Sequence, residues 1–376
     1  MPLTLEQVRW FRLQRSGLIE PFERATEVAR ALVGVQAQIL PAAGLSLWNR
    51  LPALSHDSYE RLLFEERTLV KLWGQRGTLH LYASDEWPLI HAANAVRNRW
   101  WERHAEDAAA YAKAADAVGA LIEERGTLGR SDLRESEIAL EDHHFSAWGG
   151  IFAELVRRGV ACHGPAEGGE GRFMARSHWL PELEWAPPDG DEANVKLARR
   201  FFAAYGPATV QDFAYWRGWY VAACKRWLAA LGDDLVEVTV DGAPMLALRD
   251  DLDALRRTPP PHDAWPVRML YRFDPLLLAV KDKSWLVDDA HYKRIWRPAG
   301  HIEGTIIDHG RAVATWRYQR KSSGLSIGVS PFAPLPTHVQ RAVEGQAQAI
   351  AAFFGLPLQE ITVDSVGRHA VASAVE

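Results

Sequence analysis

Residues 124–133 read ERGTLGRSDL, and residues 204–213 read AYGPATVQDF. Both stretches contain a glycine, five residues, an aspartate and then a large apolar residue. In each case a segment with helical apolar spacing precedes the glycine, and a second short helix is expected after it, capped by Ser131 or Thr209. The pattern indicates an internal repeat of one supersecondary unit.

Both copies continue in the same way. SAWGGIFAELVRRG (146–159) and WYVAACKRWLAAL (219–231) predict a third helix in each copy. A β-hairpin is expected after each helix, and the second hairpin turns at Asp241-Gly242. Three helices followed by a hairpin is the order of a winged helix.

The N-terminal segment follows this plan more loosely. We expect a first helix at 4–15, capped by Thr4 with Gln7 at the capping-box position, and a second helix at 21–34. A third helix is expected at 55–73 and a strand at 76–84. The sequence therefore predicts an α+β protein with three tandem winged-helix units, over 1–105, 106–190 and 191–258.

A proline-rich linker, TPPPHDAWP (258–266), separates these units from a segment of different character. The segment 259–376 is expected to be a β-rich subdomain closed by an amphipathic helix at 337–355. A turn is expected at Asp308-His309-Gly310. The strand-like stretches are 269–280, 284–288, 301–308, 312–321 and 325–330.

Composition excludes several classes of protein. No run approaches 18 apolar residues, so no membrane span is expected, and the N-terminus lacks the apolar region of a signal peptide. Cys162 and Cys224 lie far apart and form neither a disulfide framework nor a zinc pattern, which fits a reducing cytoplasm. The common nucleotide-binding, metalloprotease and hydrolase motifs are absent from the sequence. We expect no metal and no cofactor.

Charge is unevenly distributed. The net charge is −5, which argues against a simple nucleic-acid binder. From Trp265 to Lys321, however, eleven Lys or Arg face six Asp or Glu, a local net charge of +5. Such a segment is either a solvated face or a footprint for phosphates.

The tripeptide Gln-Ala-Gln occurs at 36–38 and again at 346–348. Gly34 and Pro41 flank the first copy and weaken a helix there, so we expect the helix to end near Gly34. Residues two apart share a face only in an extended chain, where Gln36 and Gln38 point the same way. The second copy flanks an apolar helical stripe, and we interpret Gln346 and Gln348 as solvent-facing structural residues.

A pair of amides limits the chemistry at the first copy. Glutamine does not titrate, so Gln36 and Gln38 are not general acids or bases. They can hold and orient a water molecule and stabilise developing charge, which suits a leaving group that is already activated. The alternative is that both are ordinary glutamines bonded to backbone. Spacing alone does not separate these interpretations.

Five stretches of the sequence match one known family, in order, through nearly the whole chain: GVQAQ (34–38), LVKLWGQRGTLHLY (69–82), YGPATVQDFAYWRG (205–218), RMLYRFDPLLL (268–278) and GHIEGTIIDHGRAVATWR (300–317). Through them the chain resembles the AlkZ-type winged-helix DNA glycosylases. The resemblance implies that Gln36 and Gln38 are catalytic and belong to the Gln-x-Gln branch, which is associated with resistance to DNA-alkylating natural products.

The resemblance also implies a substrate and a mode of binding. The expected reaction is hydrolysis of N7-alkylated purines in double-stranded DNA, on bulky adducts or interstrand crosslinks. A concave scaffold and a C-terminal β-hairpin are expected to meet the lesion. The residues implied in DNA binding are Asp308, His309, Gly310 and Arg311 at the hairpin tip, and Arg317, Arg320 and Lys321 beyond it.

Other interpretations remain open at this stage. A non-catalytic winged-helix DNA-binding protein, such as a regulator or a lesion sequestrant, has the same fold, and so does an interaction protein. We expect Asp274 to be a buried ion-pair partner of Arg272 or a nearby arginine, and His80 to lie on a packing strand. The sequence carries no oligomeric signal, and a cytoplasmic, nucleoid-associated monomer is expected.

Overall fold

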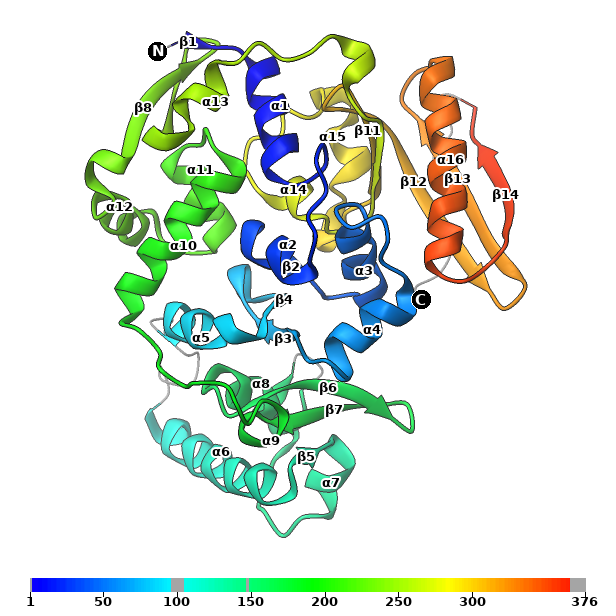
Figure 1. Ribbon diagram of the computed structural model, residues 1–376. Helices are drawn as coiled ribbons and strands as arrows, with labels where there is room; N and C mark the ends of the chain where they lie inside the picture. The colour runs from blue at the N-terminus through cyan, green and yellow to red at the C-terminus, as the bar shows by residue number, and fades with distance from the viewer. Residues whose placement is uncertain (1, 96–104, 147–148, 366–376) are drawn as a thin grey trace. The chain divides into compact units, whose positions relative to one another are not determined.

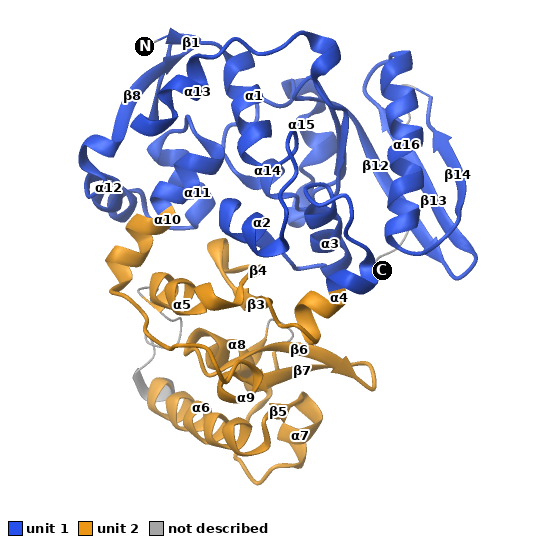
Figure 2. Ribbon diagram, in the orientation of Figure 1, with its two compact units in different colours: residues 1–59, 198–376 blue, residues 60–197 orange. Residues whose placement is uncertain are grey.

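The structure is a computed structural model that describes residues 2–95, 105–146 and 149–365. It is a mixed α and β protein, so the predicted fold class is confirmed. The chain forms two compact units, one of residues 1–59 with 198–376 and one of residues 60–197 (Figure 2). Within the described ranges, no helix is long and apolar enough to cross a membrane.

The first unit begins with a short strand and three helices. These elements are β1 (Pro2–Leu3), α1 (Leu5–Arg15), α2 (Ala25–Ala31) and α3 (Leu40–Trp48), with β2 (Val35–Gln36) between the last two. The predicted capping box on α1 is confirmed: the Gln7 N–H donates to the Thr4 hydroxyl, and the Thr4 N–H donates to the Gln7 side chain. The second helix was expected from residue 21 but begins at Ala25.

The repeat found in the sequence has a structural cause. Asp132 and Asp212 each lie at the third position of a short helix, α7 (Arg130–Glu135) or α11 (Val210–Arg217). The Asp132 carboxylate accepts from the Gly129 N–H at 2.6 Å, and the Asp212 carboxylate accepts from the Thr209 N–H at 2.9 Å. Each aspartate thus accepts from a backbone N–H group at the start of its helix, where such groups have no partner within the helix. Thr209 is the cap as predicted, but Gly129 takes the place expected for Ser131.

The first unit also contains the second copy of the repeat. Its elements are α10 (Gly190–Tyr205, which begins in the other unit), α11, α12 (Val221–Ala229), β8 (Leu235–Val240), β9 (Ala243–Leu248) and α13 (Leu252–Arg256). β8 and β9 pair across the predicted Asp241-Gly242 turn, and β1 adds a parallel strand to β8. The predicted order of three helices and a hairpin is found here.

The C-terminal part of the first unit is a five-stranded sheet in the order β10-β11-β12-β13-β14. Its strands are β10 (Arg268–Leu270), β11 (Gly304–Asp308), β12 (Arg311–Lys321), β13 (Gly324–Pro331) and β14 (Leu358–Val363). α16 (Thr337–Phe353) covers one face of this sheet (Figure 1), and Val343, Ile350, Trp316 and Ile327 are buried between them. The expected sheet and the helix expected at 337–355 are found, and β14 after that helix adds a strand that the sequence did not predict.

Two strands predicted in this region are wrong. The stretch 269–280 contains only β10 and then α14 (Pro275–Leu278), because Asp274 caps a helical turn through the Leu276 N–H at 3.0 Å. The stretch 284–288 forms no strand and precedes α15 (Asp289–Ile295).

The second unit contains two small β-elements packed with helices. Its elements are β3 (Leu69–Trp73), β4 (Leu79–Ala83), α5 (Trp87–Ala95), α6 (Ala105–Arg125), β5 (Thr127–Leu128), α7, α8 (Gly150–Arg157), β6 (Ala161–Glu167), β7 (Glu170–Ala175) and α9 (Arg176–Trp179). The predicted hairpin is β6–β7, to which β5 adds a third strand. The helix expected at 146–159 is described from Gly150, and residues 147–148 lie outside the described ranges.

One long helix predicted in the N-terminal segment is wrong. The helix expected at 55–73 is α4 (His56–Phe64), which begins in the first unit and ends at Phe64. Arg67 has a positive φ of 55°, which breaks the helix, and Leu69–Trp73 then pairs with β4 as an antiparallel strand. The strand predicted at 76–84 is confirmed as β4.

Candidate active site

The helix before the first Gln-Ala-Gln ends where the sequence predicted. α2 stops at Ala31, and the Gly34 N–H donates to the Ala29 carbonyl at 2.7 Å. Gly34 has a φ of +96°, which an L side chain rarely adopts, so a glycine is required there. The chain leaves this turn as β2, and the non-helical conformation expected for Gln36 is confirmed.

Val33 shows that this exit from the helix is strained. It is a buried β-branched residue with a φ of +55°, in the left-handed region that costs an L residue about 1–2 kcal/mol. Strain of this kind concentrates at active sites and ligand clamps, where the surrounding structure holds it in place. No sequence signal indicated it, since valine is an unusual residue for such a turn.

The two glutamines differ in exposure. The Gln36 side chain is buried, with a relative exposure of 6%, and Val35 and Ala37 beside it are fully buried. Gln38 is exposed, and Ile39 after it is exposed at 38%. A buried amide has a fixed position, whereas an exposed amide is accessible to water and to a ligand.

Contacts from distant parts of the first unit hold the residues before the motif. The Tyr205 hydroxyl donates to the Leu32 carbonyl at 2.9 Å. Arg12 is buried, and its guanidinium donates to the carbonyls of Tyr205 at 2.9 Å and Pro207 at 2.7 Å. Burial lowers the pKa of Arg12 to about 10, yet it remains charged near neutral pH. This chain of hydrogen bonds connects α1, the end of α10 and the turn before Gln36.

The residues after the motif are held by the C-terminal sheet region. α3 begins at Leu40 with Pro41 in its first turn, and most of its residues are buried. At its end, Arg50 forms a bidentate ion pair with Asp274, with Nη1–Oδ2 and Nη2–Oδ1 distances of 2.7 and 2.9 Å. The Asn49 amide donates to the Met269 carbonyl at 3.1 Å. Asp274 is therefore the buried ion-pair partner that we expected, but its arginine comes from a distant part of the chain.

The residues predicted to contact DNA at the β11–β12 turn form contacts with other residues of the protein. His309 Nε2 lies 3.2 Å from Glu6, and Asp308 lies 3.2 Å from His338. Arg311 forms an ion pair with Asp288. A Cβ on Gly310 would lie 3.0 Å from Arg9, so this turn packs closely against α1.

Arg317, Arg320 and Lys321 divide into two groups. The Arg317 guanidinium binds the buried Glu303, which Arg297 also contacts at 2.9 Å, and this arrangement lowers the pKa of Glu303 against the effect of burial. Arg320 and Lys321 are exposed at the end of the β12–β13 hairpin (Figure 1) and form no ion pair within the described part of the chain. Of the residues predicted to bind DNA, these two are the exposed cations.

The second Gln-Ala-Gln is structural, but not as expected. Gln346 is half-buried: its oxygen accepts from the Met269 N–H at 2.9 Å, and its nitrogen donates to the Val267 carbonyl at 2.9 Å. Gln346 therefore fixes α16 to β10, and the expectation that it faces solvent is wrong. Gln348 is exposed as expected.

Comparisons with known proteins agree with the resemblance noted in the sequence. A family model described as "DNA glycosylase AlkZ-like" matches residues 29–353, a range that includes both Gln36 and Gln38. The chain is 29% identical over 379 residues to an interstrand DNA cross-link repair glycosylase of Streptomyces sahachiroi, covering 95% of this chain and 98% of the relative. It is also similar to the solved structure of the Streptomyces sahachiroi DNA glycosylase AlkZ. That match has a TM-score of 0.79 and 27% identity, and it covers 97% of this chain and 100% of the other.

Proposed function

The chain belongs to the AlkZ-like DNA glycosylase family, and on this basis we propose that it hydrolyses the N-glycosidic bond of N7-alkylated purines in double-stranded DNA. Bulky adducts and interstrand crosslinks are the proposed lesions. The single observation that supports this most directly is the position of Gln36 and Gln38, on a non-helical segment that follows the strained turn at Val33 and Gly34 and lies between α2 and α3.

The reaction requires little from the protein once the base is alkylated. Alkylation at N7 makes the purine cationic, and the electron pair of the breaking bond between C1′ of the sugar and the base neutralises that charge. The sugar becomes oxocarbenium-like, as in other glycosidic cleavages. A water oxygen then bonds to C1′, and its second proton passes to solvent. Neutral amides suit this reaction because the leaving group needs no general acid.

The two amides have separate roles in this proposal. Gln38 orients the attacking water, which its exposure supports because solvent reaches the side chain. Gln36 contacts the water or the sugar–phosphate from a fixed, buried position. The arginine-anchored segments on either side limit movement of both residues.

DNA binding is proposed to use the exposed end of the β12–β13 hairpin. Arg320 and Lys321 supply positive charge there, and phosphate contacts of this kind position a protein without reading sequence. A monomer is proposed to carry out the reaction. Arg317 is assigned to stabilising the hairpin through Glu303 rather than to the phosphates.

The proposal is tested by base release from a graded set of duplexes. Each duplex carries one lesion: a small N7-alkylguanine, a bulky N7-guanine adduct, an N7-linked interstrand crosslink or a small N3-alkyladenine. Release of free base from the bulky or crosslinked guanine supports the proposal. If the protein binds these duplexes and releases base from none of them, it acts as a DNA-binding protein instead.

A further inference from the structure

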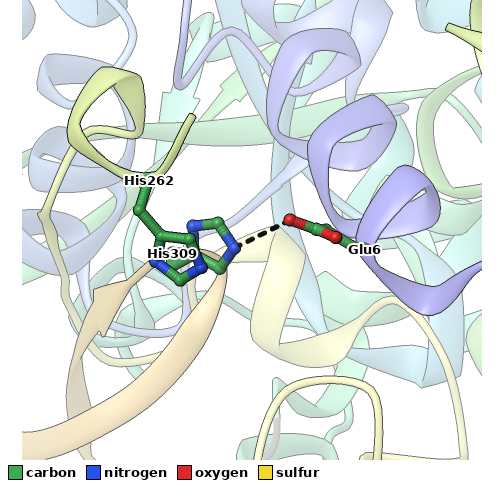
Figure 3. A group of neighbouring side chains, drawn as sticks. All are labelled: Glu6, His262 and His309. Carbon is green, nitrogen blue, oxygen red and sulfur yellow. Dashed lines mark hydrogen bonds and ion pairs between the residues drawn. The ribbon is translucent and has the colours of Figure 1, made fainter. Parts of the chain in front are cut away.

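Three possible metal ligands from distant parts of the first unit meet beside the β11–β12 turn (Figure 3). Glu6 lies in the first turn of α1, His262 begins a short 3-10 helix at His262–Ala264, and His309 is in the turn itself. Their ligand atoms all lie within 4.8 Å of one another. None of the three belongs to the proposed catalytic pair, so this cluster needs a separate explanation.

Local backbone contacts and turn geometry position His309 and His262. His309 and Gly310 form a two-residue hairpin turn with φ values of +50° and +69°, where Asn, Asp or Gly is the usual first residue. A histidine in this position has a strained backbone, and its side chain is a possible metal ligand. His262 follows three consecutive prolines, and the Trp265 indole N–H donates to the Pro260 carbonyl at 3.0 Å, which fixes this linker.

The two imidazoles stack face to face. Their ring centroids are 3.1 Å apart with an interplanar angle of 7°. His309 Nε2 faces a Glu6 carboxylate oxygen at 3.2 Å. The other nitrogen, His309 Nδ1, is buried without a hydrogen-bond partner among the described residues. A buried nitrogen of this kind is costly unless something binds it.

The cations near the cluster have partners of their own. Of the nearby cations, Arg311 is paired with Asp288, and the Arg9 guanidinium donates to the Trp285 carbonyl at 2.6 Å.

We propose that Glu6, His262 and His309 form a zinc site that ties α1 and the linker to the β11–β12 turn. Two imidazole nitrogens and one carboxylate oxygen are a known donor set for Zn²⁺, with water as a fourth ligand. In the stacked arrangement the lone pairs of the two rings lie in parallel planes and do not point at one ion. One ring therefore rotates when the ion binds. His262 is exposed and has room to do so. The site is separate from base release.

Equilibrium binding of ZnCl₂ to the full chain tests this proposal. The experiment uses protein without an affinity tag, because histidine tags bind zinc. The protein is first treated with a chelator, which is then removed. Titration calorimetry and elemental analysis are expected to give about one zinc ion per chain. Glu6→Gln, His262→Ala and His309→Asn are each expected to weaken zinc binding at least about tenfold, the lower end of the loss seen when even an outer-shell partner is removed.

A matched control is His338→Ala. His338 is exposed and lies 3.2 Å from Asp308 of the same turn, but among the described residues it belongs to no group of three possible metal ligands. This variant is expected to keep the zinc affinity of the wild type. Glu6 and His262 are exposed, so their substitution removes no core contact, and circular dichroism checks that both variants fold. The proposal is overturned if the wild type binds no zinc or if Glu6→Gln and His262→Ala bind it as tightly as His338→Ala.

Discussion

Arg50 and Asp274 form a bidentate ion pair in which both side chains are 0% exposed. Arg50 follows the helix that leads away from the Gln36–Gln38 segment, and Asp274 caps α14 in the C-terminal part of the chain. Arg50 also donates to the carbonyls of Ser16 at 2.7 Å and Ser46 at 2.8 Å. One buried group thus connects three segments around the candidate active site.

Removing the carboxylate from this pair is expected to destabilise the protein strongly. Asp274→Ala leaves a buried arginine without its counter-charge, and breaking a buried pair in this way costs about 3–5 kcal/mol. Urea unfolding measures the change in free energy. The matched control is Asp253→Ala, which removes the partner of Arg256 in an exposed pair and is expected to cost less than about 1 kcal/mol. Equal losses in the two variants contradict the role assigned to Asp274.

Acid is expected to destabilise the second unit through His80. This ring is buried, its Nδ1–H donates to the Thr78 carbonyl at 3.0 Å, and burial, with a smaller effect from Arg76, lowers its pKa from 6.5 to about 3. The unfolded chain therefore binds the proton more readily. Stability is complete above about pH 6.5 and falls as the pH drops toward 3, by up to about 1.4 kcal/mol per pH unit.

Urea unfolding between about pH 7.5 and about pH 5 measures this loss. His80→Gln keeps a hydrogen-bond donor but does not titrate, so its stability is expected to fall less steeply with acid than that of the wild type. His301→Gln, at an exposed position, is expected to keep the wild-type slope. If the stability of the wild type and of His80→Gln falls equally with pH, His80 is ruled out as the source of the acid destabilisation.

DNA affinity is expected to depend on the end of the β12–β13 hairpin. Arg320→Ala combined with Lys321→Ala removes two exposed cations, so the logarithmic dependence of affinity on salt is expected to become shallower by about 2. Fluorescence anisotropy at several salt concentrations measures this slope. Lys196→Ala with Arg199→Ala changes the net charge equally, but carboxylates already neutralise those cations, and the slope is expected to stay unchanged. An unchanged slope for the Arg320→Ala, Lys321→Ala protein excludes the hairpin as the phosphate contact.

Local features of the fold were predictable because short-range rules determine them. The capping boxes at Thr4 and Thr209, the Asp241-Gly242 turn and the end of α2 near Gly34 all follow from residues within a few positions of one another. The first Gln-Ala-Gln could be recognised as non-helical for the same reason.

Features that depend on distant residues could not be predicted. Arg50 pairs with a residue 224 positions away, and Gln346 binds backbone 77 and 79 positions away. α3 was missed because it is buried on nearly every side and so lacks an amphipathic pattern, and Pro41 resembles a helix breaker although it fits the first turn. The His262–His309 stack joins two segments that no sequence motif connects.

The central claim is that the amides of Gln36 and Gln38 perform base release. The most direct measurement is single-turnover release of a bulky N7-alkylguanine by the double variant Gln36→Ala, Gln38→Ala, with DNA affinity measured on the same duplex. Gln348→Ala is the control, since it removes an exposed amide of the same tripeptide from α16. The double variant is expected to bind DNA normally but release base at least about a hundredfold more slowly, the loss typical of removing one positioned catalytic donor, while the control variant retains its rate. Release at the wild-type rate by the Gln36→Ala, Gln38→Ala protein would contradict the catalytic role of the two amides.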